Sequence, residues 1–455
     1  MFYKNQWKKT IIFSLLFAFV FLSTIFSSIL FQNQSAYAVK EEDWDRFLQN
    51  KNFIEAVNEV EKHWERDYEQ YFNQNLADFS LTAENIASTL SNISQQTGTK
   101  PAVVWIWPRE QQLQLVIITP DAKPQIYSMK NVDKDTLITV VKELNLTVTS
   151  PSIRRTKAYL EPAQKLYTWM VKPLEYTLNK EKIDTILFCL GSGLRTLPLS
   201  VLHDGDNFLI EKYSIARIPA FNLMDTKYQK PNNYQILAMG ASEFSQQESL
   251  PAVPLELDEI TQEFGSNQKF LNQEFTLKNF QNQRQNQTFD IIHLATHAEF
   301  NTGTPDNSYI QFWGNERVSL DQIDKLKLNQ PQVKLLVLSA CRTALGDEEA
   351  ELGFAGLTVK SGVKSVLASL WNVSDIGTLG LMTEFYQHFQ NLPLKAKALQ
   401  TAQIAMLKGQ VGIKSGKLQG SQNSLQLPPE LAELRDENFS HPYYWSAFTI
   451  IGNPW

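Results

Sequence analysis

The amino-acid sequence predicts an α/β fold for most of the chain, a three-layer α/β/α sandwich with a mainly parallel sheet. From residue 183 onward, short apolar runs alternate with segments of helical period. Several of these runs are apolar on both faces, which is typical of parallel strands that helices cover from both sides. The predicted strands are residues 185–190, 214–219, 234–240, 289–296, 333–340 and 363–370, and the predicted helices are residues 255–264, 352–361, 376–390 and 393–408.

The composition is that of a globular protein with more than one folding unit. The chain has 455 residues, of which 43% are hydrophobic and 20% are charged. Its formal net charge is -6, so it lacks a basic excess that could neutralise phosphates, and we expect no nucleic-acid partner. The two cysteines are too few for a disulfide framework or a cysteine-rich zinc site.

The first forty residues have the features of an export signal. Three lysines, at positions 4, 8 and 9, precede an uncharged apolar run over residues 11–31, and Ala36-Tyr37-Ala38 follows. These are the parts of a secretory signal, with cleavage expected after Ala38. The apolar run is also long enough to span a bilayer if it stays uncleaved. Residues 1–38 are therefore a signal peptide or a membrane anchor. We expect the rest of the chain in the periplasm, in the thylakoid lumen or outside the cell, with membrane contact only through an uncleaved segment.

An N-terminal region, residues 40–150, lies between this segment and the main sheet. Residues 41–75 carry one apolar stripe at helical spacing and predict a pair of helices. Residues 82–147 predict a small α/β unit, because prolines separate short apolar runs there. Its predicted elements are helices over 82–96 and from 132 onward, and strands over 102–107, 112–119 and 124–129.

The main domain is predicted over residues 155–455, after a boundary at Pro151 and Ser152. It opens with a long amphipathic helix over 155–178. Residues 409–440 are rich in Gly, Ser, Gln and Pro, and predict a flexible loop.

Two residues that follow predicted strands could carry chemistry. His297 follows the strand at 289–296, and Cys341 follows the strand at 333–340. In an open parallel sheet, ligands bind at the carboxyl ends of the strands. If these two strands are neighbours, the imidazole can take the thiol proton and leave a thiolate nucleophile. The alternative is a buried cysteine and a hydrogen-bonded histidine without a chemical role.

Five sequence blocks resemble those of the CHAT domain, a bacterial branch of the caspase-like cysteine peptidases that also includes separases. The blocks are LRTLPLSVLHDGDNFLIEKYSI (194–215), HLATHAEF (293–300), LVLSACRTALGDEEAELGFAGL (336–357), VLASLWNVSD (366–375) and HPYYWSAFTIIGNPW (441–455). The resemblance covers residues 155–455, and the upstream region is similar to that of cyanobacterial CHAT proteins. It implies a caspase-like sandwich and the activity of a thiol protease.

The resemblance also assigns roles to residues. The family's dyad maps onto His297 as general base and Cys341 as nucleophile, and the backbone N–H groups of Ala298 and Cys341 would form the oxyanion hole. Caspase-like peptidases usually have glycine at the position of Ala298, and alanine can present the same N–H unless the turn requires a positive φ. We expect no cofactor, and as partners a protein or peptide substrate and a regulatory protein that contacts the N-terminal region. The alternative is a CHAT domain that has lost catalysis and only binds other proteins.

Asp375 is the predicted substrate-binding residue. It follows the strand at 363–370 and resembles the acidic residue with which separases hold the basic side chain of the substrate. A carboxylate can bind a guanidinium with two charge-assisted hydrogen bonds, so cleavage after basic residues is expected. The alternative role of Asp375 is to cap the following helix. His293 is expected to be a core histidine, and the histidines have no metal-ligand spacing, so we predict no metal site.

Export predicts a defined N-terminus for the protein isolated from its native host. If the signal is cleaved after Ala38, N-terminal sequencing should begin at Val39. A start at Met1 in the membrane fraction would indicate the uncleaved anchor. Recovery from the cytosol with Met1 retained would contradict both forms of the prediction.

Overall fold

The computed structural model describes residues 41–76, 81–229, 233–265, 268–392 and 394–455. Its centre is one large sheet with the strand order β10-β9-β8-β11-β12-β17-β5-β4-β1-β2-β3, in which β6 pairs with β8 and β7 pairs with β6. The strands are β1 (Pro101–Pro108), β2 (Leu113–Ile118), β3 (Gln125–Met129), β4 (Thr185–Leu190), β5 (Ser214–Ile218), β6 (Ile236–Gly240), β7 (Lys269–Leu271), β8 (Ile291–Phe300), β9 (Tyr309–Gln311), β10 (Arg317–Ser319), β11 (Leu335–Thr343), β12 (Ser365–Ser369) and β17 (Phe448–Gly452).

The sheet is mainly parallel. Strands β7, β6, β8, β11 and β12 form one parallel block, and β17, β5, β4 and β1 form a second. The two blocks run in opposite directions because β17 pairs with β12 in antiparallel orientation. Parallel neighbours need long crossover connections, which here are largely helical. The predicted α/β class is confirmed.

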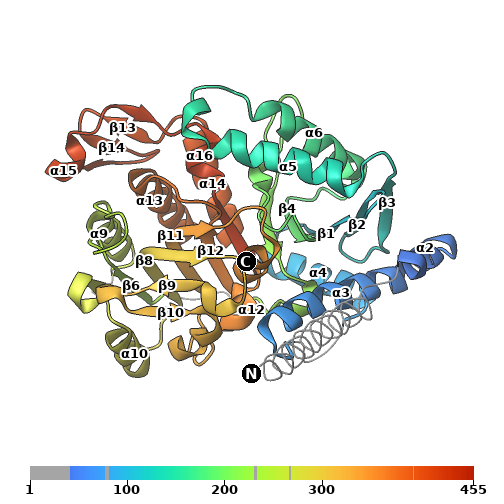
Figure 1. Ribbon diagram of the computed structural model, residues 1–455, viewed down its shortest axis with the longest axis horizontal. Coiled ribbons are helices and arrows are strands. Elements are labelled where there is room, and N and C mark those ends of the chain that lie inside the picture. Colours follow the sequence, from blue (N-terminus) through green and yellow to red (C-terminus); the bar gives the residue numbers. More distant parts are fainter. Residues whose placement is uncertain (1–40, 77–80, 230–232, 266–267, 393) are drawn as a thin grey trace, which may run out of the picture.

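Helices cover both faces of the sheet and complete a three-layer sandwich (Figure 1). In this view α9, α13, α14, α6 and α5 lie above the sheet, and α10, α12, α3 and α4 lie below it. Because both faces are covered, β4, β5, β6, β12 and β17 are buried along their whole length. The helices are α2 (Glu41–Gln49), α3 (Phe53–Phe72), α4 (Ala83–Thr97), α5 (Lys134–Thr149), α6 (Leu160–Met170), α7 (Glu175–Lys180), α8 (Leu209–Lys212), α9 (Val253–Glu263), α10 (Leu277–Asn286), α11 (Glu348–Ala355), α12 (Leu357–Ser361), α13 (Asp375–Asn391), α14 (Lys395–Leu407), α15 (Pro429–Ala432) and α16 (Pro442–Trp445).

The N-terminal unit continues the main sheet. β1 pairs in parallel with β4, so β1, β2 and β3 extend the second block across the boundary expected at residues 150–155. A buried cluster that includes Trp44, Trp64 and Trp105 joins α3 and α4 to this extension. Within it, the buried carboxylate of Glu61 accepts a hydrogen bond of 2.5 Å from Trp105 Nε1, and burial raises the pKa of Glu61. The region before residue 150 and the main domain therefore share one sheet.

Two predicted elements are wrong. The helix expected over 155–178 is interrupted around Pro173, where a short 3-10 turn separates α6 from α7, because proline cannot donate the helical hydrogen bond. The loop expected over 409–440 forms an antiparallel sheet in the order β15-β14-β13-β16. Its strands, β13 (Gly412–Lys414), β14 (Lys417–Gln419), β15 (Ser424–Gln426) and β16 (Glu437–Asn438), are too short to show a period in the sequence. The buried carboxylate of Glu384 anchors this sheet by accepting hydrogen bonds of 2.6 and 2.5 Å from the N–H and hydroxyl of Ser421.

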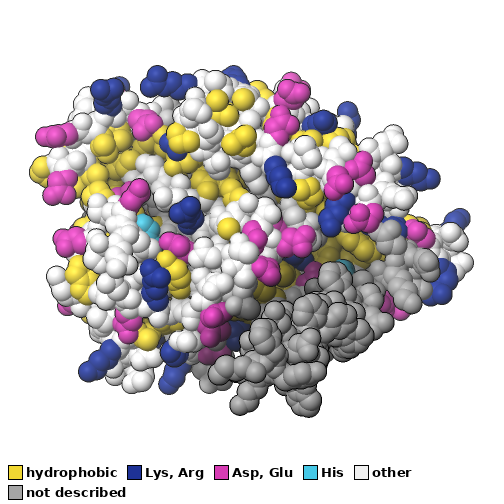
Figure 2. All heavy atoms as spheres, in the orientation of Figure 1, with side chains coloured by type: hydrophobic (Ala, Val, Ile, Leu, Met, Phe, Trp, Pro, Cys, Tyr) yellow, Lys and Arg dark blue, Asp and Glu magenta, His cyan; other side chains and the backbone are white. Residues whose placement is uncertain are grey.

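The described part of the chain contains no helix that is both long enough and apolar enough to cross a bilayer. The signal or anchor predicted at residues 1–38 lies outside the described residues. On the face drawn in Figure 2, acidic and basic side chains are interspersed, with small apolar patches between them.

Candidate active site

His297 and Cys341 lie on neighbouring strands. β8 and β11 pair in parallel, from Leu335 opposite Ile291 to Thr343 opposite Phe300. Both strands continue beyond the ends expected at residues 296 and 340, so the two residues lie inside the ladder instead of beyond it. All four residues 297–300 pair with β11, and Ala298 and Glu299 also pair with β9 on the other side.

The register of this ladder places the two side chains on opposite faces of the sheet. The residue paired with His297 is Ala340, whereas Cys341 is paired with Ala298. Paired residues project to the same face, and successive residues alternate. Phe300, which shares a face with Ala298, contacts an aromatic ring of α11 with centroids 5.4 Å apart. Cys341 therefore points to the face that α11 covers, and His297 points to the other face.

His297 is oriented by the loop that precedes α9. Its Nε2 lies 2.8 Å from the carbonyl oxygen of Glu248, and its ring contacts the ring of Phe244 at a centroid distance of 4.6 Å. A carbonyl oxygen can only accept a hydrogen bond, so Nε2 is a donor, and the neutral tautomer that fits this contact has its free electron pair on Nδ1. The arrangement suits a general base that works through Nδ1.

Cys341 is fully buried and protonated. Its Sγ lies 3.5 Å from the carbonyl oxygen of Leu338, and its own carbonyl accepts a hydrogen bond of 3.0 Å from Ser369 Oγ. Burial raises the pKa of the Cys341 thiol to about 12, so the thiolate is scarce at neutral pH. The described conformation is closed, and the dyad is not assembled in it.

The two predicted oxyanion residues, Ala298 and Cys341, are paired with each other in the ladder between β8 and β11. Ala298 and Cys341 are both fully buried, and Ala298 is paired with Ile310 of β9 on its other side. Ala298 has the extended backbone of β8 and no positive φ, so alanine is unstrained where the family usually has glycine. A substrate carbonyl cannot reach either N–H group until the ladder opens.

Asp375 lies against the same loop as His297. It is the first residue of α13, and its Oδ2 accepts a hydrogen bond of 2.6 Å from the N–H of Ala252, the residue before α9. Burial raises the pKa of Asp375 to about 7, and the nearby carboxylate of Glu256 adds to this effect. Asp375 therefore caps a helix, but the helix is α9 and not the α13 that follows it.

His293 is a core histidine, as predicted. It is fully buried, with Nδ1 3.0 Å from the hydroxyl of Tyr386 and Nε2 2.9 Å from the carboxylate of Glu256. Both ring nitrogens thus have partners on α9 and α13. This leaves His297 as the histidine that is available for chemistry at the end of β8.

Several residues of the site carry no signal in the sequence. Glu351 of α11 is buried, and its carboxylate accepts hydrogen bonds from Thr196 Oγ1 at 2.8 Å and from the N–H of Gly193 at 3.1 Å. Phe244 and Glu248 belong to a loop without a motif, and Glu248 acts through its backbone. Ser369, whose hydroxyl binds the carbonyl of Cys341, is an exception: it is a polar residue at the end of an apolar strand, and the sequence could have indicated it.

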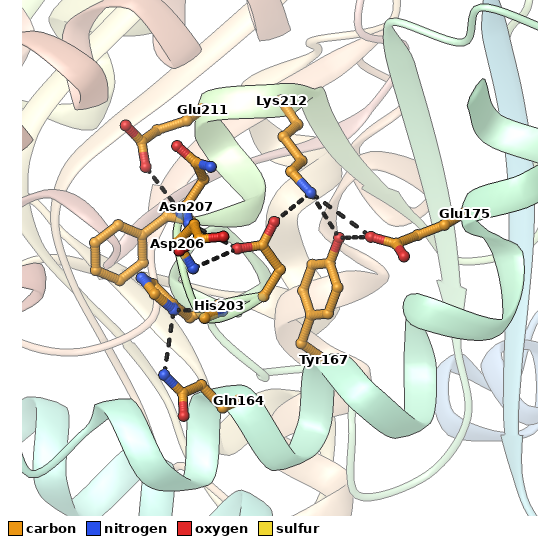
Figure 3. Close-up of polar contacts among 11 residues, drawn as sticks. Gln164, Tyr167, Glu175, His203, Asp206, Asn207, Glu211 and Lys212 are labelled. Carbon is orange, nitrogen blue, oxygen red and sulfur yellow. Dashed lines mark hydrogen bonds and ion pairs between the residues drawn. The ribbon is translucent and has the colours of Figure 1, made fainter.

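The motif at residues 194–215 has a structural role. Figure 3 shows its polar contacts: Lys212 of the motif donates a hydrogen bond to the hydroxyl of Tyr167 in α6, which in turn donates one to Glu175 in α7. The Asp204 carboxylate accepts hydrogen bonds from the N–H groups of Asp206 and Asn207 at 2.8 and 2.7 Å and pairs with Lys212. Although partial burial opposes ionisation, these partners lower the pKa of Asp204 to about 2. The group is a satisfied network that holds the turn before β5.

A cavity of about 270 Å³ lies beside His297, with Glu243, Phe244 and Trp313 in its wall. One carboxylate, Glu243, together with two aromatic rings suits a cationic side chain. In the described ranges, no group of three or more His, Cys, Asp or Glu residues is placed to hold a metal ion.

The family model of the CHAT domain matches residues 160–453. The chain belongs to the CHAT domain family. No curated protein matches the sequence of this CHAT domain protein.

Three solved structures resemble this CHAT domain protein. Separase in its complex with securin, from Saccharomyces cerevisiae, is 12% identical with a TM-score of 0.48, over 89% of this chain and 34% of that chain. The complex of the Porphyromonas gingivalis RgpB pro- and mature domains is 12% identical with a TM-score of 0.38, over 71% and 77% of the two chains. The Arg-specific cysteine proteinase gingipain R is 13% identical with a TM-score of 0.38, over 70% and 74%. The chain spans about a third of the separase chain. All three scores are low, so the fold class rests on the strand order and the family match.

The raised pKa of Asp375 predicts a pH-dependent stability. Its pKa in the folded state, about 7, exceeds the unfolded value of about 4, so the folded state binds more protons between these values. The stability that protonated Asp375 contributes is present below about pH 4 and is lost as the pH rises through about 7. Asp375→Asn keeps an acceptor oxygen without the charge. Above pH 7 it should be more stable than wild type by on the order of 2–4 kcal/mol, measured by denaturant unfolding at pH 5 and pH 8.

The control is Asp135→Asn, an exposed carboxylate in the first turn of α5. It should leave the pH profile of stability unchanged. Identical profiles for wild type and Asp375→Asn would contradict the prediction.

Proposed function

We propose that this CHAT domain protein is an exported cysteine endopeptidase that cleaves peptide bonds after basic residues. The observation that carries the proposal is an oriented imidazole next to a cysteine-bearing strand: His297 is held by the Glu248 carbonyl, and Cys341 is one residue out of register with it. Membership of the CHAT family supports the same chemistry. The apolar run at residues 11–31 supports export.

The reaction needs only groups of this chain and water. Nδ1 of His297 takes the proton of the Cys341 thiol, and the thiolate attacks the carbonyl carbon of the peptide bond. The backbone N–H groups of Ala298 and Cys341 hold the oxyanion. The C–N bond then breaks, the amine leaves with the proton from His297, and a thioester remains. Water hydrolyses the thioester and restores the free thiol. Asp375 pairs with the basic side chain before the cut.

The closed conformation must rearrange before this chemistry. Leu338 pairs with Leu294, but Ala340 pairs with His297, so β8 has one residue more than β11 between the two pairs. If pairing continued from Leu338 without this bulge, Cys341 would pair with His297. A one-residue change of register moves side chains to the other face of a sheet. The shift that removes the bulge would therefore also turn the thiol toward the imidazole. The closed conformation is the latent form of the enzyme.

A regulatory protein could favour the open form through the N-terminal helices. α3 packs against α11, the helix that follows Cys341 in the chain. The fit is close: a Cβ on Gly356 would lie 2.6 Å from the ring of Phe72, and one on Gly353 would lie 2.9 Å from the hydroxyl of Tyr71. A partner that displaces α3 would therefore disturb α11 and release the end of β11.

A non-catalytic interaction module is the second candidate function. The observation that favours it is the closure itself, with Cys341 fully buried and on the face opposite His297. In this function the sheet edge near His297 binds a peptide, and no bond is broken.

Removal of the dyad should abolish cleavage without unfolding the protein. Cys341→Ala and His297→Ala should each lower kcat/KM on a basic peptide by about three orders of magnitude or more, because residues that act as a unit are not additive. A thiol-directed peptide probe with arginine at the cleaved position should label wild type at Cys341, read by mass spectrometry of the labelled peptide.

Cys189→Ala is the matched control, because Cys189 is the other buried cysteine and lies in β4. It should retain both cleavage and labelling. Full activity in Cys341→Ala would overturn the peptidase proposal. Wild type that is folded but inert and unlabelled, with the N-terminal helices intact or displaced, would favour the interaction module.

The role of Asp375 in specificity is tested with the same Asp375→Asn variant. Loss of a charge-assisted hydrogen bond in a closed pocket costs roughly 1.5–3 kcal/mol, which is about ten- to a hundredfold in kcat/KM. The loss should be confined to substrates with Arg or Lys at the cleaved position. An equal loss on substrates with every residue type there would mark Asp375 as a cap of α9 only.

A further inference from the structure

The helix that follows the candidate cysteine, α11, begins with the acidic run DEEAE (347–351). Acidic residues are common in the first turn of a helix, because they interact favourably with its positive end. Asp347 has this ordinary role, since its Oδ1 accepts a hydrogen bond of 2.9 Å from the N–H of Ala350. The three glutamates of the run instead bind segments outside the helix. They are Glu348, Glu349 and Glu351.

Glu351 fastens α11 to the segment that follows β4. Its side chain is fully buried. Its Oε1 accepts a hydrogen bond of 2.8 Å from Thr196 Oγ1, and its Oε2 accepts one of 3.1 Å from the N–H of Gly193. Hydrogen bonds to an ionised carboxylate are stronger than those between neutral groups. Both of them must break before α11 can leave this segment.

The two exposed glutamates fasten the start of the same helix. Glu348 accepts a hydrogen bond from the hydroxyl of Ser192, which also belongs to the segment after β4. Glu349 Oε2 accepts a hydrogen bond of 2.6 Å from the N–H of Gly303, in the loop that follows β8. The carboxylates therefore connect α11 to two segments that are far apart in the sequence.

α11 lies on the face of the sheet to which Cys341 points. It packs on both β8 and β11, and its Phe354 ring contacts Phe300 at the end of β8 with centroids 5.4 Å apart. The Cys341 side chain is fully buried under this cover. Residues 344–347 connect the end of β11 to α11, so a displacement of the helix is transmitted to the strand end that carries the thiol.

We propose that Glu348, Glu349 and Glu351 form an autoinhibitory clasp, which holds α11 over Cys341 and keeps the thiol out of reach of substrates. When the clasp is released, α11 can lift from the sheet and the thiol becomes accessible. Cys341 matters here as the proposed nucleophile, so the clasp rests on the proposed function. The accessibility of the thiol can nevertheless be measured without any cleavage.

The rate at which iodoacetamide alkylates Cys341 under native conditions tests the clasp. Every protein in the comparison carries Cys189→Ala, so that Cys341 is the single thiol of the chain. Glu351→Ala and the double variant Glu348→Ala/Glu349→Ala should each be alkylated about tenfold faster or more than the parent. The reason is that alkylation follows the population of the locally open form, which rises when charge-assisted hydrogen bonds are lost. Mass spectrometry of the intact protein over time gives the rates.

Glu384→Ala is the matched control. Glu384 is also a buried glutamate that accepts hydrogen bonds from another segment, here from the N–H and the hydroxyl of Ser421. It lies in α13, so its loss loosens the small sheet of β13 to β16 instead of α11. Global unfolding exposes the thiol in every variant, and denaturant unfolding measures that contribution. Beyond it, Glu384→Ala should be alkylated no faster than the parent.

The outcomes separate the clasp from the peptidase proposal. If Glu351→Ala does not fold, the double variant decides, because both of its residues are exposed. The clasp would be overturned by clasp variants that react no faster than their global unfolding explains, or by a parent thiol that reacts as fast as in the unfolded chain. Neither result bears on cleavage. Faster alkylation of the clasp variants without cleavage of any basic peptide would support the clasp and count against the peptidase.

Discussion

The pairing of β8 with β11 is the constraint on which the candidate site depends. Parallel pairing brings His297 and Cys341 onto adjacent strands, and the bulge in β8 decides which residues face each other. A single extra residue in one strand is enough to place the two side chains on opposite faces. The ladder between β8 and β11 therefore brings the two residues onto adjacent strands, and the bulge within it keeps the thiol on the face opposite the imidazole.

The loop over residues 242–252 links the other parts of the site. The carbonyl of Glu248 orients His297, and the ring of Phe244 contacts the imidazole. The N–H of Ala252, just before α9, donates a hydrogen bond to Asp375 at the start of α13. Burial keeps the Cys341 thiol protonated and raises the pKa of Asp375 toward neutrality, so both groups carry less charge than in water. A substrate with a cationic side chain would favour ionised Asp375, and an open ladder would return Cys341 to water. Burial thus raises the pKa of both candidate groups, although only Asp375 contacts this loop.

The N-terminal unit is structurally part of this arrangement. It extends the sheet through β1 and packs α3 against α11 on the face that covers Cys341. The ion pair between Arg195 and Asp67 of α3, at 2.5 Å, fastens the same helix to the segment after β4. That segment also binds the buried carboxylate of Glu351 in α11. Cover over the cysteine is therefore supplied by residues far apart in the sequence.

The sequence by itself determined the fold class, strands β1 to β6, β8, β11 and β12 of the main sheet, and the choice of His297, Cys341 and Asp375 as candidate residues. These are local properties: apolar runs of strand length and polar residues directly after them. Strands β7, β9, β10 and β17 of the same sheet were not predicted. The break in the helix at Pro173 could also have been predicted from the sequence, because a single proline causes it. The short strands of residues 409–440 could not, because three-residue strands have no period and are held by Glu384 from another element.

Only the tertiary structure decided the register of the ladder, and with it the relation of His297 to Cys341. Whether β8 carries one residue more than β11 depends on β9 and β11 pairing with its end from both sides, and no residue in the sequence marks the bulge. The partners of Asp375 and His297 are likewise backbone groups of a loop, an N–H and a carbonyl that every sequence offers. Side-chain patterns identify the candidate groups in advance, whereas their backbone partners appear only when the chain is folded.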